Sequence, residues 1–271
     1  MASQPDLIFF PESYGDLFAE WDRHPHAAPF AGGTALFRAR DSQEPELPPV
    51  IISLERIEEM GRISRSERYL EIGAMAKLSK IIEMRKFAPD VLARCLRSIS
   101  GPQLRNMATI GGNVCCRLDS AAALTALDAQ YELRGVQSSR WVSAARFSPE
   151  LGPGALGPRE LLTRIRVPLD GWGYSAYKKF PGSGKCAVFL ANPQKNMLAD
   201  IRAVCKCADG ILRDKDGEML LIGKRLPLTG RIAAAFVAHW DAFLRGAEGV
   251  DEVSRREFAG FLEANVAALA E

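Results

Sequence analysis

The pattern of apolar and polar positions predicts a chain that alternates between strands and helices. Short apolar runs bounded by Gly, Pro or polar clusters predict strands. In the first two-thirds of the chain we expect them at residues 7–10, just before 32, and at 50–54, 69–73, 131–135, 140–142 and 161–167. Apolar positions at helical spacing predict helices over 14–21, 78–84, 89–99 and 119–129. Ser13 with Asp16 three residues later resembles a capping box at the start of the first helix.

A second part of the chain is expected to begin after 168–171. A loop with three glycines and three prolines, residues 148–158, interrupts the first part before this point. The later strands are predicted at 174–180, 186–191, 200–206 and 219–222, the last one after a turn at 215–217. Two helices, over 229–244 and 253–270, close the sequence, and their apolar faces serve either a domain core or a partner. The pattern therefore predicts an α+β fold divided into residues 1–168 and 172–271.

Composition excludes several classes of protein. The 271 residues are 47% hydrophobic and 25% charged, which suffices for a substantial core. Thirty-five Lys and Arg stand against 33 Asp and Glu, a net charge of +2 without long runs of one sign, so nucleic acid or an anionic membrane is not an expected partner. Residues 1–7 lack a basic stretch followed by an apolar one, and no run approaches roughly 18 apolar residues. We expect no membrane span and a cytoplasmic location.

The cysteines and histidines predict no metal site. Six cysteines are too sparse and unevenly spaced for a disulfide scaffold, and reduced thiols are expected; they are Cys95, Cys115, Cys116, Cys186, Cys205 and Cys207. No C-x-x-C pair occurs, and three histidines give no ligand spacing for structural zinc. Cys115 and Cys116 directly follow a glycine-rich segment, so redox or cluster chemistry stays open there beside plain packing.

Two glycine-rich segments carry the strongest chemical signal. Ala31-Gly32-Gly33-Thr34 and Thr109-Ile110-Gly111-Gly112-Asn113 lie about eighty residues apart, and each follows an apolar segment. We interpret both as turns whose main-chain N–H groups reach one diphosphate, because glycine lets the backbone approach an anion closely. Neither segment is G-x-G-x-x-G or G-x-x-x-x-G-K-[ST], so neither a Rossmann NAD site nor a nucleotide triphosphatase follows. The sequence predicts a nucleotide cofactor.

These segments belong to a longer series of motifs that resembles a known family, the FAD-binding subunits of the molybdenum hydroxylases. That family includes the flavin subunits of xanthine, nicotinate and carbon monoxide dehydrogenases. Its motifs A-G-G-T-[DE], I-G-A, R-N-x-A-T-I-G-G-N, D-x-x-P-A-L-x-A-L-D-A and E-L-[IL]-x-x-[IV]-x-[IV]-P match residues 31–34, 72–74, 105–113, 119–129 and 160–168 in the same order. The resemblance covers about residues 5–190, and the second glycine segment is its most specific part.

The resemblance implies a two-lobed FAD-binding domain over residues 1–168, with lobes at about 1–54 and 55–168, and a smaller α+β domain over 172–271. FAD would lie extended between the lobes. Transfer of the family's contacts, residue by residue, implies cofactor binding by Ala31, Gly32, Gly33, Thr34, Ile99, Ser100, Thr109, Gly112, Asn113, Asp119, Leu162 and Lys178.

Each group of these residues has an implied role. The glycine segments would hold the diphosphate and ribityl chain, Ile99 and Ser100 would border the flavin, and Leu162 would line the adenine end. Asp119 would accept a hydrogen bond from a ribose or ribityl hydroxyl; the alternative is a helix-start carboxylate. Tyr177 and Lys178 align loosely with a segment that approaches the flavin; the alternative is an exposed strand surface.

This chain departs from the family pattern near the expected flavin edge. Ala35 replaces a frequent acidic residue, and Ala122 replaces a common proline. The loop 114–118, which holds the two adjacent thiols and Arg117, is about three residues shorter than usual. These differences concern flavin affinity and the choice of electron acceptor more than the fold.

The implied function is electron transfer, with no catalytic residue acting on an organic substrate. By resemblance, a separate molybdenum-cofactor subunit would hydroxylate the substrate, and a two-iron two-sulfur subunit would relay electrons to FAD in this chain. The flavin would then reduce NAD or another acceptor. Two alternatives stay open: an assembly or interaction subunit of the same fold that has lost FAD, and a self-standing flavin oxidase. The organic substrate is not encoded in this chain.

Overall fold

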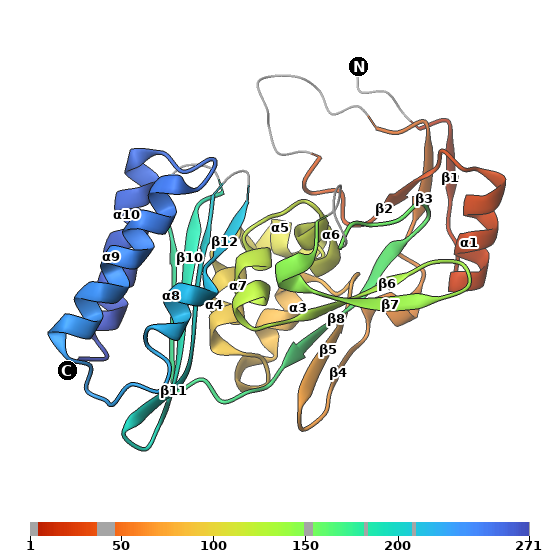
Figure 1. The fold of residues 1–271 in the computed structure, drawn as a ribbon. Helices are drawn as coiled ribbons and strands as arrows, with labels where there is room; N and C mark the ends of the chain where they lie inside the picture. The colour runs from red at the N-terminus through yellow and green to blue at the C-terminus, as the bar shows by residue number, and fades with distance from the viewer. Residues whose placement is uncertain (1–4, 37–46, 149–153, 182–183, 208–209, 271) are drawn as a thin grey trace. The chain divides into compact units, whose positions relative to one another are not determined.

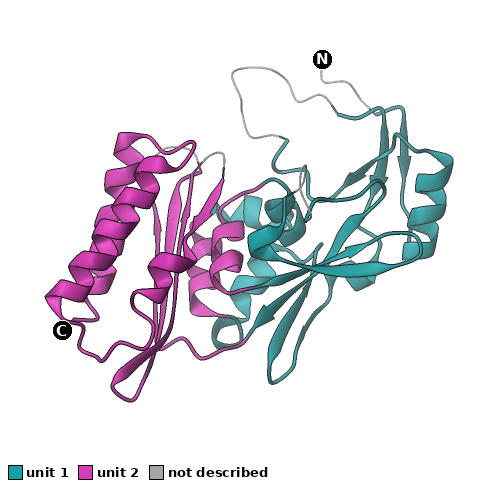
Figure 2. Cartoon of the chain, in the orientation of Figure 1, with its two compact units in different colours: residues 1–88, 99–116, 129–168 teal, residues 89–98, 117–128, 169–271 magenta. Residues whose placement is uncertain are grey.

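The computed structural model describes residues 5–36, 47–148, 154–181, 184–207 and 210–270 (Figure 1). These form two compact units (Figure 2): unit 1 comprises 1–88, 99–116 and 129–168, and unit 2 comprises 89–98, 117–128 and 169–271. Two segments of the first part of the chain thus pack in unit 2. The division into domains at 1–168 and 172–271 stays a proposal, and the loop expected at 148–158 lies partly outside the described residues.

A small parallel sheet with one helix forms part of unit 1. The strands β1 (Leu7–Phe9), β2 (Ala28–Phe30) and β3 (Val50–Ser53) pair in the order β1-β3-β2. Between β1 and β2 the chain forms α1 (Tyr14–Arg23), which buries Leu17, Phe18 and Trp21. Ser13 caps this helix, because its Oγ accepts a hydrogen bond from the N–H of Asp16 at 3.1 Å. The predicted helix start is confirmed.

An antiparallel sheet of five strands forms the larger part of unit 1. Its order is β4-β5-β8-β6-β7, and its strands are β4 (Ile63–Arg65), β5 (Tyr69–Gly73), β6 (Gln130–Arg134), β7 (Ser139–Ser143) and β8 (Leu161–Pro168). Four short α-helices complete this unit within the described residues: α2 (Glu58–Gly61), α3 (Leu78–Glu83), α5 (Pro102–Met107) and α6 (Ile110–Cys115). The sequence pattern predicts α3 but not α2, β4, α5 or α6. Segments of three to six residues give only a weak periodic signal, so such elements are easily missed.

Unit 2 is built on an antiparallel sheet of four strands in the order β12-β11-β10-β9. These are β9 (Tyr174–Lys179), β10 (Cys186–Gln194), β11 (Met197–Lys206) and β12 (Ile211–Arg213). The helices α4 (Asp90–Arg97) and α7 (Ser120–Ala126) pack on β9, β10 and β11. The helices α9 (Gly230–Gly246) and α10 (Glu252–Ala267) cover the opposite face. Because both faces are covered, residues 186–191 of β10 are all buried and apolar rather than alternating.

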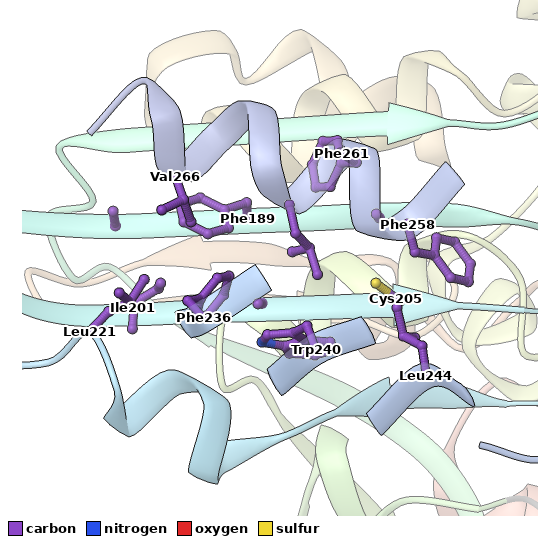
Figure 3. Close-up of a cluster of buried hydrophobic side chains, with 14 of the residues drawn as sticks. Phe189, Ile201, Cys205, Leu221, Phe236, Trp240, Leu244, Phe258, Phe261 and Val266 are labelled. Carbon is purple, nitrogen blue, oxygen red and sulfur yellow. The ribbon is translucent and has the colours of Figure 1, made fainter. Parts of the chain in front are cut away.

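The core of unit 2 lies between its sheet and the two C-terminal helices (Figure 3). Phe236 and Trp240 of α9 and Phe258 of α10 are fully buried there. They pack with Phe189 of β10 and Ile201 of β11 in one hydrophobic cluster. The apolar faces of the two final helices therefore form a core of their own unit.

The prediction of a turn at 215–217 and a strand at 219–222 is wrong. Residues Lys215–Met219 form the helix α8, because both carboxylate oxygens of Asp214 accept hydrogen bonds from the first-turn N–H groups of Asp216 and Gly217. Leu221 is fully buried in the core cluster, which explains its apolar character without a strand. The fourth strand of the sheet is β12. No helix in the described ranges is long and apolar enough to cross a membrane.

Candidate functional site

The two glycine segments come together within unit 1. A Cβ atom added to Gly32 would lie 2.1 Å from the carbonyl oxygen of Met107, two residues before Thr109. A Cβ atom added to Gly112 would reach the Cβ of Ala31 at 4.0 Å and Thr109 Oγ1 at 3.0 Å. Since non-bonded heavy atoms repel strongly at 2.1 Å, only glycine fits at position 32 with the backbone in this arrangement.

The first glycine segment is irregular and offers main-chain donors. Gly33 has φ +67°, and a Cβ atom there would lie 2.7 Å from the ring of Phe30. In the described part of the chain, the N–H groups of Gly32, Gly33 and Thr34 donate no hydrogen bond. These residues are only partly buried. Consecutive N–H groups of this kind form a concavity that suits an anion.

The interpretation of the second glycine segment, residues 109–113, as a turn is wrong, because these residues form the start of the helix α6. Thr109 is the N-cap of α6, with its Oγ1 accepting a hydrogen bond from the N–H of Gly112 at 3.2 Å. The N–H groups of Ile110 and Gly111 already donate to the carbonyls of Ala76 and Ala74, at 3.0 and 2.8 Å. The segment therefore packs against the chain that follows β5, and fewer of its N–H groups are left for a ligand.

Close packing explains the glycine at position 111. A Cβ atom there would lie 2.7 Å from the Cβ of Ala74. Residues 72–74 and 105–113, two of the motifs in the sequence, are thus in direct contact. Thr109 and Asn113 are 3% and 4% exposed, so both residues are buried.

A single arginine holds the loop expected to border the flavin. Arg105 Nη1 lies 3.1 Å from the carbonyl oxygen of Ile99 and 2.5 Å from that of Ser100. Ser100 has φ +48°, a conformation that non-glycine residues adopt only when the surroundings hold them. Leu162 lies elsewhere in unit 1, on β8 opposite Leu133, and is 3% exposed within the sheet's buried face.

In unit 2, Asp119 is paired with Lys179. The Nζ atom of Lys179 lies 2.8 Å from Asp119 Oδ2 and donates to the carbonyl of Ser98 at 3.2 Å. The Asp119 side chain is only 7% exposed. It makes no capping hydrogen bond to α7, although it stands at the N-cap position. The helix-start alternative for this carboxylate therefore lacks its characteristic hydrogen bond.

The neighbours Tyr177 and Lys178 lie in different surroundings. The hydroxyl of Tyr177 is 2.8 Å from Ser98 Oγ, and burial raises the pKa of Tyr177 far above its ordinary value of 10.0, so the phenol stays protonated. Lys178 Nζ lies instead 5.2 Å from the centre of the Phe180 ring. Successive side chains of a strand point to opposite faces, so Tyr177 and Lys179 share one face of β9. The role of Lys178 at the cofactor stays a prediction. The structure adds Lys179 to the candidate residues, because Lys179 pairs with Asp119; alternation from Tyr177 was the available signal for it.

The adjacent cysteines differ in accessibility. All six cysteines are free thiols. Burial raises the pKa of Cys115 to about 12, so its thiol is protonated near neutral pH, while Cys116 is exposed. The partly buried, protonated thiol of Cys115, the last residue of α6, favours a packing role.

Comparison with known proteins identifies the family. The family described as the FAD binding domain in molybdopterin dehydrogenase matches residues 3–170, more than half of the chain. The carbon monoxide dehydrogenase medium chain of Hydrogenophaga pseudoflava is 30% identical over 204 residues, which cover 70% of this chain and 71% of that one. Aldehyde oxidase 2 of Macaca fascicularis is 29% identical over 174 residues, 58% of this chain. That match covers only 13% of the aldehyde oxidase, so this chain corresponds to a small part of its length.

A solved structure shares the fold over the whole chain. The structure titled reconstituted CO dehydrogenase from Oligotropha carboxidovorans contains a chain that superposes with a TM-score of 0.83. The match covers 100% of this chain and 98% of that one at 24% sequence identity. The predicted α+β fold of the flavoprotein type and the resemblance stated from the motifs are both confirmed. The chain belongs to the family of FAD-binding domains of molybdopterin dehydrogenases, and FAD is the cofactor of this domain.

Proposed function

We propose that this chain is the FAD-carrying electron-transfer subunit of a molybdenum hydroxylase. It takes electrons from a two-iron two-sulfur subunit and passes them to NAD or another acceptor, while a molybdenum-cofactor subunit oxidises the organic substrate. The motif series and the likeness to a carbon monoxide dehydrogenase medium chain support this assignment. The cytoplasmic location expected from the sequence is part of the proposal.

One observation carries the proposal: the unpartnered N–H groups of Gly32, Gly33 and Thr34 lie in a backbone that packs directly on Met107, next to the second glycine segment. A diphosphate carries negative charge, and hydrogen bonds from N–H groups to a charged acceptor are stronger than those to a neutral one. A side chain at position 32 or 33 would collide with Met107 or Phe30. The donor set and the absence of side chains both suit the diphosphate of FAD.

The other residues proposed at the FAD site bind and orient the cofactor, and none of them reacts. Bound FAD supplies the redox chemistry by accepting electrons and delivering them to an acceptor. Arg105 holds the carbonyls of Ile99 and Ser100, which shapes the loop proposed to border the flavin. In unit 2, Lys179 keeps the Asp119 carboxylate in one orientation, and that carboxylate is proposed to accept from a ribose or ribityl hydroxyl. No general base is required of this chain.

The test is the visible absorption spectrum of the purified chain, before and after addition of FAD and then of a reductant. We expect flavin bands that bleach on reduction. NAD added to the reduced chain then identifies the acceptor, because NADH formation and return of the flavin bands must occur together. A folded, colourless chain that takes up no FAD would overturn the proposal and favour the assembly or interaction subunit.

A further inference from the structure

A groove in unit 1 is separate from every residue assigned to FAD. It lies between one face of α1, from Tyr14 to Asp22, and the turn that joins β6 to β7, residues 134–139. Figure 1 shows the tip of this hairpin reaching toward α1. The groove has a volume of about 620 Å³. Sites for small organic molecules typically fall within roughly 300–1,000 Å³, so a compact ligand would fit.

The charged group of the groove is Arg134, at the end of β6. Its guanidinium carbon lies 4.2 Å from the centre of the Tyr14 ring, so the ring stacks against one face of the cation. Its nearest carboxylate oxygen, Glu132 Oε1, is 3.8 Å away, beyond hydrogen-bonding distance. Among the residues that the structure describes, the Arg134 guanidinium makes no hydrogen bond. A guanidinium carries five N–H donors in a planar fork that matches the oxygens of a carboxylate or phosphate.

The carboxylates near Arg134 are shared with other arginines. Glu132 also pairs with Arg164 at 3.5 Å, and Arg164 and Arg166 share Glu71 at 3.3 and 2.7 Å. Three guanidiniums therefore share two carboxylates along this row of the sheet. The other acidic side chain of the groove, Asp22, is paired with Arg159 at 2.5 Å. Glu59 is a further carboxylate that acts on the Tyr14 hydroxyl. The ion pair of Arg134 is nevertheless the longest of this set, so its N–H donors are left for the oxygens of a ligand.

The rest of the groove is suited to an apolar body. Phe18 and the exposed side chain of Val136 line it together with the Tyr14 ring. Burial raises the pKa of Tyr14 above its ordinary value of 10.0, so its hydroxyl stays protonated and can donate a hydrogen bond. Gly15 leaves the helix side of the groove open: a Cβ atom there would meet only Ser13 Oγ, at 3.6 Å.

We propose that this groove binds a small organic anion, with an apolar or aromatic body, whose carboxylate or phosphate oxygens accept hydrogen bonds from the Arg134 guanidinium. The ligand is held at its charged end by Arg134 and along its body by Phe18 and Val136. The lining of the groove includes none of the residues assigned to FAD.

The test is isothermal titration calorimetry on the chain saturated with FAD, with benzoate, phenyl phosphate and the neutral benzamide as probes. We expect at least one anion to bind at millimolar concentration or below, and benzamide to bind more weakly. Whether benzoate or phenyl phosphate binds more tightly distinguishes a carboxylate from a phosphate ligand. Arg134→Met should weaken anion binding by roughly tenfold or more, because it removes charge-assisted hydrogen bonds.

Two further variants separate this site from general charge and folding effects. Gly15→Ala fills the groove with a methyl group but keeps Arg134 and favours the helix, so it should lower the affinity for both anions without loss of folding. Arg166→Met removes a cation from the same row, yet its guanidinium lies on Trp141 and Tyr69 rather than in the groove. The anion affinity of the Arg166→Met variant should match that of the unmodified chain.

Several results would overturn the proposal. These are no anion binding at millimolar concentration, equal binding of benzamide and benzoate, equal effects of Arg134→Met and Arg166→Met, and unchanged affinity in Gly15→Ala. Anion binding seen only without FAD, and lost when FAD is saturating, would mean that the groove belongs to the flavin site.

Discussion

Lys178 and Lys179 are adjacent, carry the same charge and lie on opposite faces of β9. Lys179 forms an ion pair with Asp119 at 2.8 Å and donates to the carbonyl of Ser98, whereas Lys178 lies over the Phe180 ring. A carboxylate that is only 7% exposed needs a charged or hydrogen-bonding partner, because burial of an unpaired charge is costly. Lys179 is therefore the lysine expected to support the function of Asp119.

Replacement of each lysine by methionine tests this difference. We expect Lys179→Met to weaken FAD binding by about tenfold, or ~1.4 kcal/mol, because Asp119 loses the cation that orients it. Lys178→Met should leave the affinity unchanged, and Lys179→Arg should retain most of it. The measurement is a fluorescence titration of FAD, with urea unfolding of each variant as a check on folding. Equal losses in the two methionine variants would contradict the assigned role of Lys179.

Gly32 illustrates a residue whose identity follows from close packing. We expect Gly32→Ala to reduce the free energy of unfolding by about 1–3 kcal/mol, because its Cβ would meet the Met107 carbonyl at 2.1 Å and the two segments must separate. Gly61→Ala is the matched control, since a Cβ there has no neighbour within 4 Å. Urea unfolding gives both values. A Gly32→Ala variant as stable as Gly61→Ala would mean that the backbone at 32 adjusts freely.

At the scale of elements, the sequence predicted every α-helix of seven or more residues in the described part of the chain, but only α3 among the shorter ones. The helices α1, α9 and α10 are 10 to 17 residues long. Each follows a capping residue, Ser13, Thr229 or Asp251, whose side chain accepts a hydrogen bond from a first-turn N–H group. Length gives a periodic signal and the cap gives a boundary. Helix α6 has a cap but only six residues with two glycines, so its sequence favours a turn. Its helical form depends on packing against residues 74–76.

An ion pair between β7 and the residue before β8 predicts a pH dependence. Arg140 holds Glu160 through two hydrogen bonds of 2.8 and 2.6 Å, and the N–H of Gly157 adds a third. These contacts, with the Arg140 bonds foremost, hold the pKa of Glu160 below its ordinary value of 4.5. A carboxylate with a lowered folded-state pKa stabilises the folded state above the ordinary pKa, and that contribution is lost as the pH falls through the lowered value.

Glu160→Gln should therefore be less stable than the unmodified chain near neutral pH. The difference should shrink as the pH falls from 4.5, the ordinary pKa, through the lowered folded-state pKa, below which Glu160 of the unmodified chain is also uncharged. Urea unfolding midpoints of both proteins across this range measure the effect. A difference that stays constant with pH would indicate that charge at Glu160 does not contribute.

At the scale of the whole molecule, the residues assigned to FAD divide between the two units. The glycine segments, Ile99, Ser100 and Leu162 belong to unit 1, whereas Asp119 and Lys178 belong to unit 2. Residues 89–98 and 117–128 belong to unit 2, and the segment between them in the sequence, 99–116, belongs to unit 1. The chain passes from unit 2 to unit 1 at Ile99, and back to unit 2 just before α7.

FAD should stabilise the folded chain by an amount that grows with the logarithm of the FAD concentration relative to its dissociation constant. A ligand present at 100 times its dissociation constant adds about 2.7 kcal/mol to the free energy of unfolding, if it binds only the folded state. Thermal unfolding with FAD, and with riboflavin as a control that lacks the diphosphate, measures this effect. We expect a clear increase in Tm with FAD and a smaller one with riboflavin at equal concentration. Equal increases would argue against a diphosphate site at Gly32–Thr34.

The sequence by itself determined the long helices, most strands, the family and FAD as cofactor. These depend on local patterns: periodicity, capping side chains and short motifs whose residues are neighbours along the chain. Tertiary structure decided which lysine meets Asp119, that 109–113 begins a helix, that α4 and α7 belong to unit 2, and that Arg134 lines a groove. Each of these depends on contacts between residues far apart in the sequence, and such contacts arise only when the chain packs.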